Sequence, residues 1–307
     1  MALRLARVPG VVLVSLAAAL WGLDALIRKP LATSVSATTI VFGEHVVLVA
    51  LTLPLLVPAL LALWRAGPAY VAAGVAVGAG ASAIATILFT QAFIHGDVIT
   101  VVVLQKAQPL VAVVGAWLLL HEQPRPGFAW FLLPALAGIW LIALPDPLEP
   151  HAHGLTPIVE TLGAAALWGI GTVLGRFLAK RLRFEHVTTV RFAFGLVASA
   201  CALPIVGTAA FSSAEDSAWI ALLAVVTGLL ALSLYYYGLQ RTPALLAAIG
   251  ELAFPVTATL VGIYVFDSRP NWTQWIGIAV TVGVISLLPA RRRQIVEVPP
   301  GEPALAT

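Results

Sequence analysis

The chain has 307 residues, of which 60% are apolar and only 10% are charged. Soluble proteins have roughly 45–50% apolar and about 25% charged residues. A water-soluble fold is therefore excluded, as is a cysteine metal cage or disulfide framework, because Cys201 is the only cysteine. The net charge of +3 gives no broad basic face, so no nucleic-acid partner is expected.

Ten apolar stretches, separated by Gly, Pro and charged residues, predict ten transmembrane helices. They cover residues 8–27, 36–63, 69–94, 98–120, 127–145, 156–178, 187–208, 217–238, 244–266 and 272–290. The runs are too long and too uniformly apolar for barrel strands, so the predicted class is an all-α membrane protein. The first stretch resembles a secretory signal, but apolar segments continue to residue 290, and we interpret it as an uncleaved span.

The distribution of Lys and Arg predicts the orientation. With the N-terminus inside, eleven of these residues fall in inner segments, and three (Arg28, Lys29 and Arg269) fall in outer loops. The positive-inside rule then places both termini in the cytoplasm of a multi-pass inner-membrane protein. This bias also explains the pI near 9.3.

The two halves of the chain resemble each other. The matched features are Trp21-Gly22 with Trp168-Gly169, Thr38-Thr39 with Thr188-Thr189, Leu53-Pro54 with Leu203-Pro204, Pro109 with Pro255, and Trp130 and Gly138 with Trp275 and Gly283. Five helices in each half predict two inverted repeats, 8–145 and 156–290, an architecture of secondary transporters. An outer linker, 146–155, separates them, and residues 291–307 form a cytoplasmic tail.

These features in this order resemble the drug/metabolite transporter superfamily, EamA type. The resemblance includes the segment LYYYGLQRTPA, the prolines in helices 4 and 9, and acidic residues at Glu122 and Asp267. It implies an alternating-access carrier of small metabolites without a cofactor, and it leaves the substrate open. One departure is that the family often has an Arg early in the second helix of each repeat; Arg191 fits this pattern, but its counterpart is Val41.

Buried charges are the main candidates for a site, because an ionisable group in the membrane core costs about 2.5–3.5 kcal/mol. By residue count, Glu44 and Lys106 both lie roughly 12 Å below the outer surface and could meet. We interpret Glu44, Lys106 and the adjacent Gln105 as substrate-binding residues. The alternative is a fixed structural ion pair between Glu44 and Lys106.

Glu251 is the predicted proton-coupling residue, with Glu44 as a second candidate. The alternative is a structural, hydrogen-bonded carboxyl. Pro109 and Pro255 cannot bond the carbonyls of Gln105 and Glu251, so each should bend its helix and expose a carbonyl, or else be a simple packing kink.

Three aromatic residues complete the predicted substrate site: Trp21, Trp168 and Tyr235. Both tryptophans lie near mid-depth, away from the interfacial belt, where they could form an aromatic platform or pack the halves together. Adjacent residues project at 100° steps, so at most two of Tyr235, Tyr236 and Tyr237 can face a cavity, and the last two could be belt residues.

Four further polar residues have simpler interpretations. Asp24 is expected to pair with Arg28 one turn later. Arg191 could extend to the inner interface, and Arg176 is expected to be an interface anchor. His45 could form a proton relay with Glu44, or be a satisfied interior histidine.

Enzyme and metal motifs are missing from the sequence, including a nucleophile elbow, a Walker loop and a second histidine after His121-Glu122. The sequence therefore predicts a secondary transporter, not an enzyme, that exports a small metabolite such as an amino acid and is coupled to protons. An antiporter of sugar phosphates or nucleotide sugars is the alternative, and a lipid-modifying membrane enzyme is the alternative from another class. The predicted partners are the substrate, the lipid bilayer and protons; the oligomeric state is left open.

Overall fold

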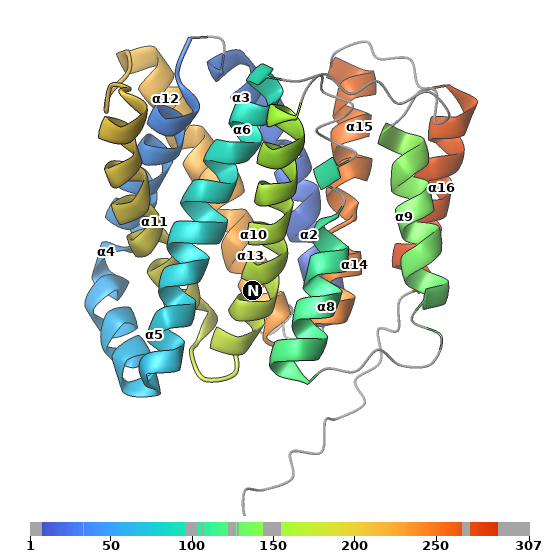
Figure 1. Cartoon of the computed structure of the whole chain (residues 1–307), viewed down its shortest axis with the longest axis horizontal. Coiled ribbons are helices and arrows are strands. Elements are labelled where there is room, and N and C mark those ends of the chain that lie inside the picture. Colours follow the sequence, from blue (N-terminus) through green and yellow to red (C-terminus); the bar gives the residue numbers. More distant parts are fainter. Residues whose placement is uncertain are drawn as a thin grey trace, which may run out of the picture.

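The computed structural model describes residues 8–32, 34–95, 104–105, 107–121, 127, 129–143, 155–265 and 271–287. Every regular element in these ranges is a helix, and the helices form one bundle (Figure 1). The predicted all-helical class is confirmed.

Within the described residues, the first half of the chain supplies eight helical elements. They are α2 (Gly10–Gly22), α3 (Asp24–Leu31), α4 (Ala37–Ala66), α5 (Pro68–Val75), the π-helix η1 (Ala76–Ile84), α6 (Ala85–His95), α8 (Gln108–Leu120) and α9 (Ala129–Ala143). The α5–η1–α6 run is continuous and matches one predicted span. Arg28, which we expected in an outer loop, lies in α3, because the helix resumes after a one-residue interruption at Leu23.

The described residues of the second half supply another eight elements. They are α10 (Thr156–Leu178), α11 (Phe184–Val206), α12 (Ala214–Leu223), the π-helix η2 (Ala224–Leu230), α13 (Ala231–Leu239), α14 (Ala244–Gly250), α15 (Ala253–Val265) and α16 (Trp272–Leu287). A π-helix thus occurs in the third predicted span of each half.

In the part of the chain that the structure describes, six helical runs are long and apolar enough to cross a membrane. They are Gly10–Arg28, Ala37–Ala66, Pro68–Ala92, Thr156–Leu178, Phe184–Val206 and Ala214–Leu239. Four shorter apolar helices, Gln108–Leu120, Ala129–Gly138, Ala244–Ala258 and Trp272–Val284, correspond to the other four predicted spans. The count of ten crossings stays a prediction.

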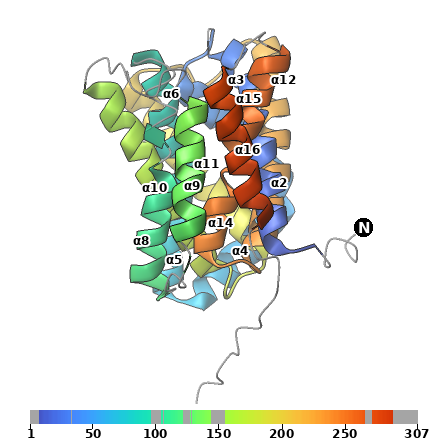
Figure 2. The same cartoon turned by 90° about the vertical axis from the view of Figure 1, so that its right-hand side faces the viewer.

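Helices of the two halves contact each other in a matched pattern. α4 packs along α11 and α9 packs along α16. α2 packs on α13 and α15, and correspondingly α10 packs on α6, η1 and α8. Figure 1 shows α2 and α10 running in opposite directions, and Figure 2 shows α2 beginning and α16 ending at the same end of the bundle. Because the first helix of each half packs against helices of the other half, polar residues from both halves lie near the centre.

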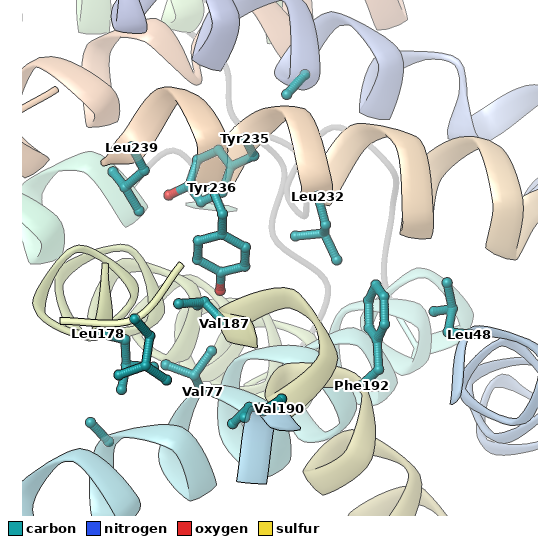
Figure 3. Close-up of a cluster of buried hydrophobic side chains, with 14 of the residues drawn as sticks. Leu48, Val77, Leu178, Val187, Val190, Phe192, Leu232, Tyr235, Tyr236 and Leu239 are labelled. Carbon is teal, nitrogen blue, oxygen red and sulfur yellow. The ribbon is translucent and has the colours of Figure 1, made fainter. Parts of the chain in front are cut away.

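The largest buried cluster lies where α4, α10, α11 and α13 meet. Figure 3 shows Leu232, Tyr235, Tyr236 and Leu239 projecting from α13, with Val187 and Val190 opposite. Close packing of this kind holds the elements in fixed registers, which in turn fixes the polar side chains described next.

Candidate functional site

Glu251 lies at a break between two helices. α14 ends at Gly250, α15 begins at Ala253, and the two residues between them form a turn. The Glu251 side chain is half-buried and faces the middle of the bundle, where three other elements contribute donors to it.

Three neutral side chains donate hydrogen bonds to the Glu251 carboxylate. The Tyr235 hydroxyl and the Thr172 hydroxyl lie 2.8 and 3.0 Å from Oε1, and the Gln108 amide bonds Oε2. Gln108 belongs to the first half of the chain, whereas the other residues belong to the second. The carboxyl group therefore connects the two halves.

A second break, at Gln108, lies opposite the first. α8 begins at Gln108 with Pro109 in its first turn, and Gln105 donates from Nε2 to Gln108 Oε1 at 2.7 Å. Gln105 is buried, so the amide pair extends the polar cluster into the first half. Gln105, Gln108, Thr172, Tyr235 and Glu251 are called the central cluster below.

The two prolines act differently from what we expected. Each lies in the first turn of a new helix, where proline is well tolerated because its missing N–H has no helical partner there. The expectation of a free carbonyl at Glu251 is wrong, since the Phe254 N–H donates a hydrogen bond to that carbonyl at 3.1 Å. The prolines begin the helices that follow the breaks.

The Trp-Gly motifs hold these breaks close to the other half. A Cβ added at Gly22 would lie 2.8 Å from the Phe254 carbonyl oxygen, and one added at Gly169 would lie 2.8 Å from the Gln108 carbonyl oxygen. Only glycine allows such an approach without displacement. The same motif thus performs the same packing role in both halves.

Trp21 and Tyr235 form an aromatic wall beside the central cluster. Their ring centroids are 5.2 Å apart, and Trp21 donates from Nε1 to the Thr227 carbonyl of η2 at 3.0 Å. Trp168 instead packs edge-on against Phe89 at 5.0 Å. Trp21 and Tyr235 are brought together, while Trp168 has a different aromatic neighbour.

The three tyrosines of α13 have different contacts. Tyr235 bonds Glu251, Tyr236 is fully buried, and Figure 3 shows the two rings leaving α13 in different directions. The belt alternative for Tyr236 is therefore wrong. Tyr237 packs against Phe184, and Arg241 lies 4.0 Å above its ring.

Glu44 lies in a separate ion-pair group. Arg28 bonds Glu44 Oε1 at 2.8 Å and also both oxygens of Asp24, so the expected Asp24–Arg28 pair is present. Lys106, the predicted partner of Glu44, lies outside the described residues. The predicted Glu44–Lys106 contact stays a prediction.

His45 and Arg176 have other contacts than those expected from the sequence. His45 bonds the Val41 carbonyl and Ser82 Oγ, so it forms no relay with Glu44 among the described residues. Arg176 is buried and donates to the carbonyls of Leu239 and Gln240, so it is not an interface anchor. Its position suits a helix end, because cations there interact favourably with terminal carbonyls.

Two residues of the central cluster escaped our site prediction. Thr172 follows Trp168 by one helical turn and therefore shares its face, which was a usable signal. Gln108 precedes Pro109, but its amide gave no indication that it would reach across to Glu251. Among the described residues, no group of three His, Cys, Asp or Glu side chains could hold a metal ion.

Long apolar helices, two matched halves and a polar cluster between them define a class of protein, the membrane transporters with internal repeats. The chain belongs to the EamA-like transporter family, whose model matches residues 8–144 and 156–288. This confirms the resemblance seen in the sequence and makes the chain a multi-pass membrane transporter.

Two curated relatives are similar over most of the chain. The riboflavin transporter ImpX of Fusobacterium nucleatum is 29% identical over 83% of this chain and 88% of its own. The uncharacterized transporter YwfM of Bacillus subtilis is 25% identical over 68% of this chain and 70% of its own. A protein of known crystal structure has a TM-score of 0.73 and 19% identity, covering 92% of this chain and 98% of that one, which supports the fold alone.

Proposed function

We propose that this transporter exports a small metabolite in exchange for protons, and that the central cluster is its substrate and coupling site. The observation that carries the proposal is the position of Glu251. It lies at a helix break, bonded by Gln108 of one half and by Tyr235 and Thr172 of the other. A carboxyl group in this position can respond to a proton and affect both halves.

Protonation changes which bonds Glu251 can make. A carboxylate is an acceptor only, and all three neighbours donate to it; a carboxylic acid carries one O–H donor and has less capacity to accept. Protonation therefore weakens the carboxyl group as an acceptor in these contacts and adds a donor, so the contacts can rearrange. If the lost contact is the one from Gln108, the polar link between the halves opens, which is the type of change that alternating access requires.

A zwitterion such as an amino acid is the first substrate candidate. Its ammonium group would bind Glu251 or Glu44, Lys106 and Gln105 would bind its carboxylate, and Trp21, Trp168 and Tyr235 would cover its side chain. Pro109 and Pro255 would act at the breaks, where the following helices can tilt.

A riboflavin-like heterocycle is the second candidate. The name of the ImpX relative supports it, as do the Trp21–Tyr235 ring pair and the Gln105–Gln108 amide pair. Aromatic faces and amide groups suit a planar, neutral ring with donors and acceptors on its edge.

For the orientation, we propose that both termini are cytoplasmic, that the 146–155 linker is outside, and that the repeats 8–145 and 156–290 are inverted in the inner membrane. The positive-inside bias and the matched helix contacts support this. A cysteine introduced at His151 of a Cys201→Ser variant should react with an impermeant reagent added outside intact cells. Reaction only after the cytoplasm is opened would contradict the orientation.

Transport in proteoliposomes tests the function. Vesicles preloaded with an amino acid or riboflavin would be supplied with the labelled compound, with and without an imposed pH gradient. Exchange that the gradient drives to accumulation would support the proposal. Transport of a substrate at the same extent with and without the gradient would contradict proton coupling.

A further inference from the structure

Arg191 of α11 lies in the core and bonds atoms from two other elements. Its Nε donates to Ser82 Oγ at 3.2 Å and one terminal nitrogen donates to the Ala81 carbonyl at 3.1 Å, both in η1. The other terminal nitrogen donates to the Tyr236 hydroxyl of α13 at 3.1 Å. The expected extension of Arg191 to the inner interface is therefore wrong.

All three acceptors are neutral. Ser82 also contacts His45 Nε2 at 3.0 Å, while His45 Nδ1 contacts the Val41 carbonyl, an arrangement that suits a neutral imidazole. Within the described residues, no carboxylate bonds Arg191. A cation inside a membrane protein is costly, so such residues mark binding sites or ion pathways.

The described residues do not use all the N–H donors of the Arg191 guanidinium group. It carries five N–H groups, and the described residues use three of them, leaving one on each terminal nitrogen. Two adjacent N–H groups match the two oxygens of a carboxylate or phosphate, which Arg binds in a bidentate manner. The unused donors can therefore bind an anion.

The position of Arg191 is also suitable for a substrate. Its bonds to η1 and α13 place the guanidinium between the two halves, and it keeps partial exposure although Ser82 and Tyr236 are buried. Tyr236 is adjacent to Tyr235 of the central cluster, with ring centroids 5.2 Å apart.

We propose that Arg191 binds an anionic group of the substrate, a carboxylate or a phosphate, while the central cluster binds the rest of the molecule. This inference rests on the proposed transport function and defines its substrate class as anionic or zwitterionic. It favours an amino acid over neutral riboflavin. Ser82 and Tyr236 are the positioning residues, since they hold the guanidinium in place.

Binding of small matched probes tests the proposal. Dissociation constants of benzoate, benzamide and phenyl phosphate would be measured on the purified protein by tryptophan fluorescence at constant ionic strength. We expect benzoate or phenyl phosphate to bind about tenfold more tightly than benzamide, since a charged hydrogen bond has about this effect. The preferred anion identifies the group as carboxylate or phosphate.

Variants assign the preference to Arg191. Arg191→Gln should lose it, Arg191→Lys should keep part of it, and the exposed Arg183→Gln control near the start of the same helix should keep all of it. Equal binding of all three probes by the wild type, no binding of any, or an unchanged preference in Arg191→Gln would overturn the proposal. A second measurement separates this proposal from the proposed function. Loss of the anion preference in Arg191→Gln tests the subsite, whereas accumulation by the wild type with and without a pH gradient tests proton-coupled transport, so either result can fail without the other.

Discussion

The two halves of the molecule share a scaffold but not a distribution of charge. Both have a Trp-Gly motif, a π-helix and a helix break before a proline. In the first half, the described buried charges pair with each other: Arg28 with Asp24 and Glu44. In the second half, Glu251, Arg191 and Arg176 bond neutral groups.

This difference bears on the proposed transport cycle. An ion pair between side chains holds two elements together, and opening it leaves two uncompensated charges. A carboxyl group among neutral donors can gain a proton, and a cation among neutral acceptors can gain an anion, without breaking an ion pair. We infer that the ion-pair group of Arg28, Asp24 and Glu44 is a fixed part of the frame, whereas Glu251 and Arg191 are groups that can respond to proton and ligand.

The largest expected effect is at Glu251. A pH difference of one unit supports about tenfold accumulation in one-for-one exchange, because it is worth about 1.4 kcal/mol. Glu251→Gln should retain exchange but reduce accumulation to about onefold, since the amide cannot titrate. Accumulation is measured in proteoliposomes with an imposed gradient; accumulation at the wild-type level would show that another group is the coupling site.

Removal of the cation at Arg28 should have the next largest effect, on stability. Arg28→Gln leaves Asp24 and Glu44 without their partner. Breaking a fully buried pair costs about 3–5 kcal/mol. Because these side chains are partly exposed, we expect the free energy of unfolding to fall by about 2 kcal/mol. Arg28→Gln with Glu44→Gln should recover part of it. Denaturant unfolding of the purified protein measures both; no recovery in the double variant would mean that the pair is not what stabilises this region.

The Trp-Gly glycines test whether the scaffold is equivalent in the two halves. Gly22→Ala and Gly169→Ala each place a methyl group 2.8 Å from a carbonyl oxygen across the interface, so each should destabilise by about 1–3 kcal/mol. Gly283→Ala is the matched control, since nothing lies within 4 Å of its added Cβ, and it should stabilise its helix by about 0.5–1 kcal/mol. Clearly unequal losses at Gly22 and Gly169 would refute the equivalence.

The sequence predicted features that depend on local pattern better than those that depend on contact. The all-helical class, the membrane location and the family were all predictable, because apolar length and repeated motifs are properties of the chain itself. The Asp24–Arg28 pair was predictable for the same reason, since a four-residue spacing places both on one helix face. The partners of Glu44, His45 and Arg191 were not, because they come from other elements whose rotation no local pattern fixes. Glu251 was singled out by its charge, and Thr172 could have been found from its spacing to Trp168, whereas the contact of Gln108 with Glu251 depends on how the helices of the two halves pack.

The smallest expected effect is the difference in stability between two variants, in which the tryptophan of one or the other Trp-Gly motif is replaced. Trp21 donates its indole N–H to the Thr227 carbonyl, whereas the structure gives Trp168 an aromatic neighbour and, among the described residues, no acceptor for its N–H. Each Trp→Phe change removes a similar amount of apolar surface, but only Trp21→Phe also leaves a carbonyl of η2 without its donor. We therefore expect Trp21→Phe to destabilise the protein by about 1 kcal/mol more than Trp168→Phe, the usual net effect of one hydrogen bond. Denaturant unfolding of the two variants under the same conditions provides the measurement. Equal losses would mean that the indole bond to the π-helix contributes nothing, and that the halves differ only in their charged residues.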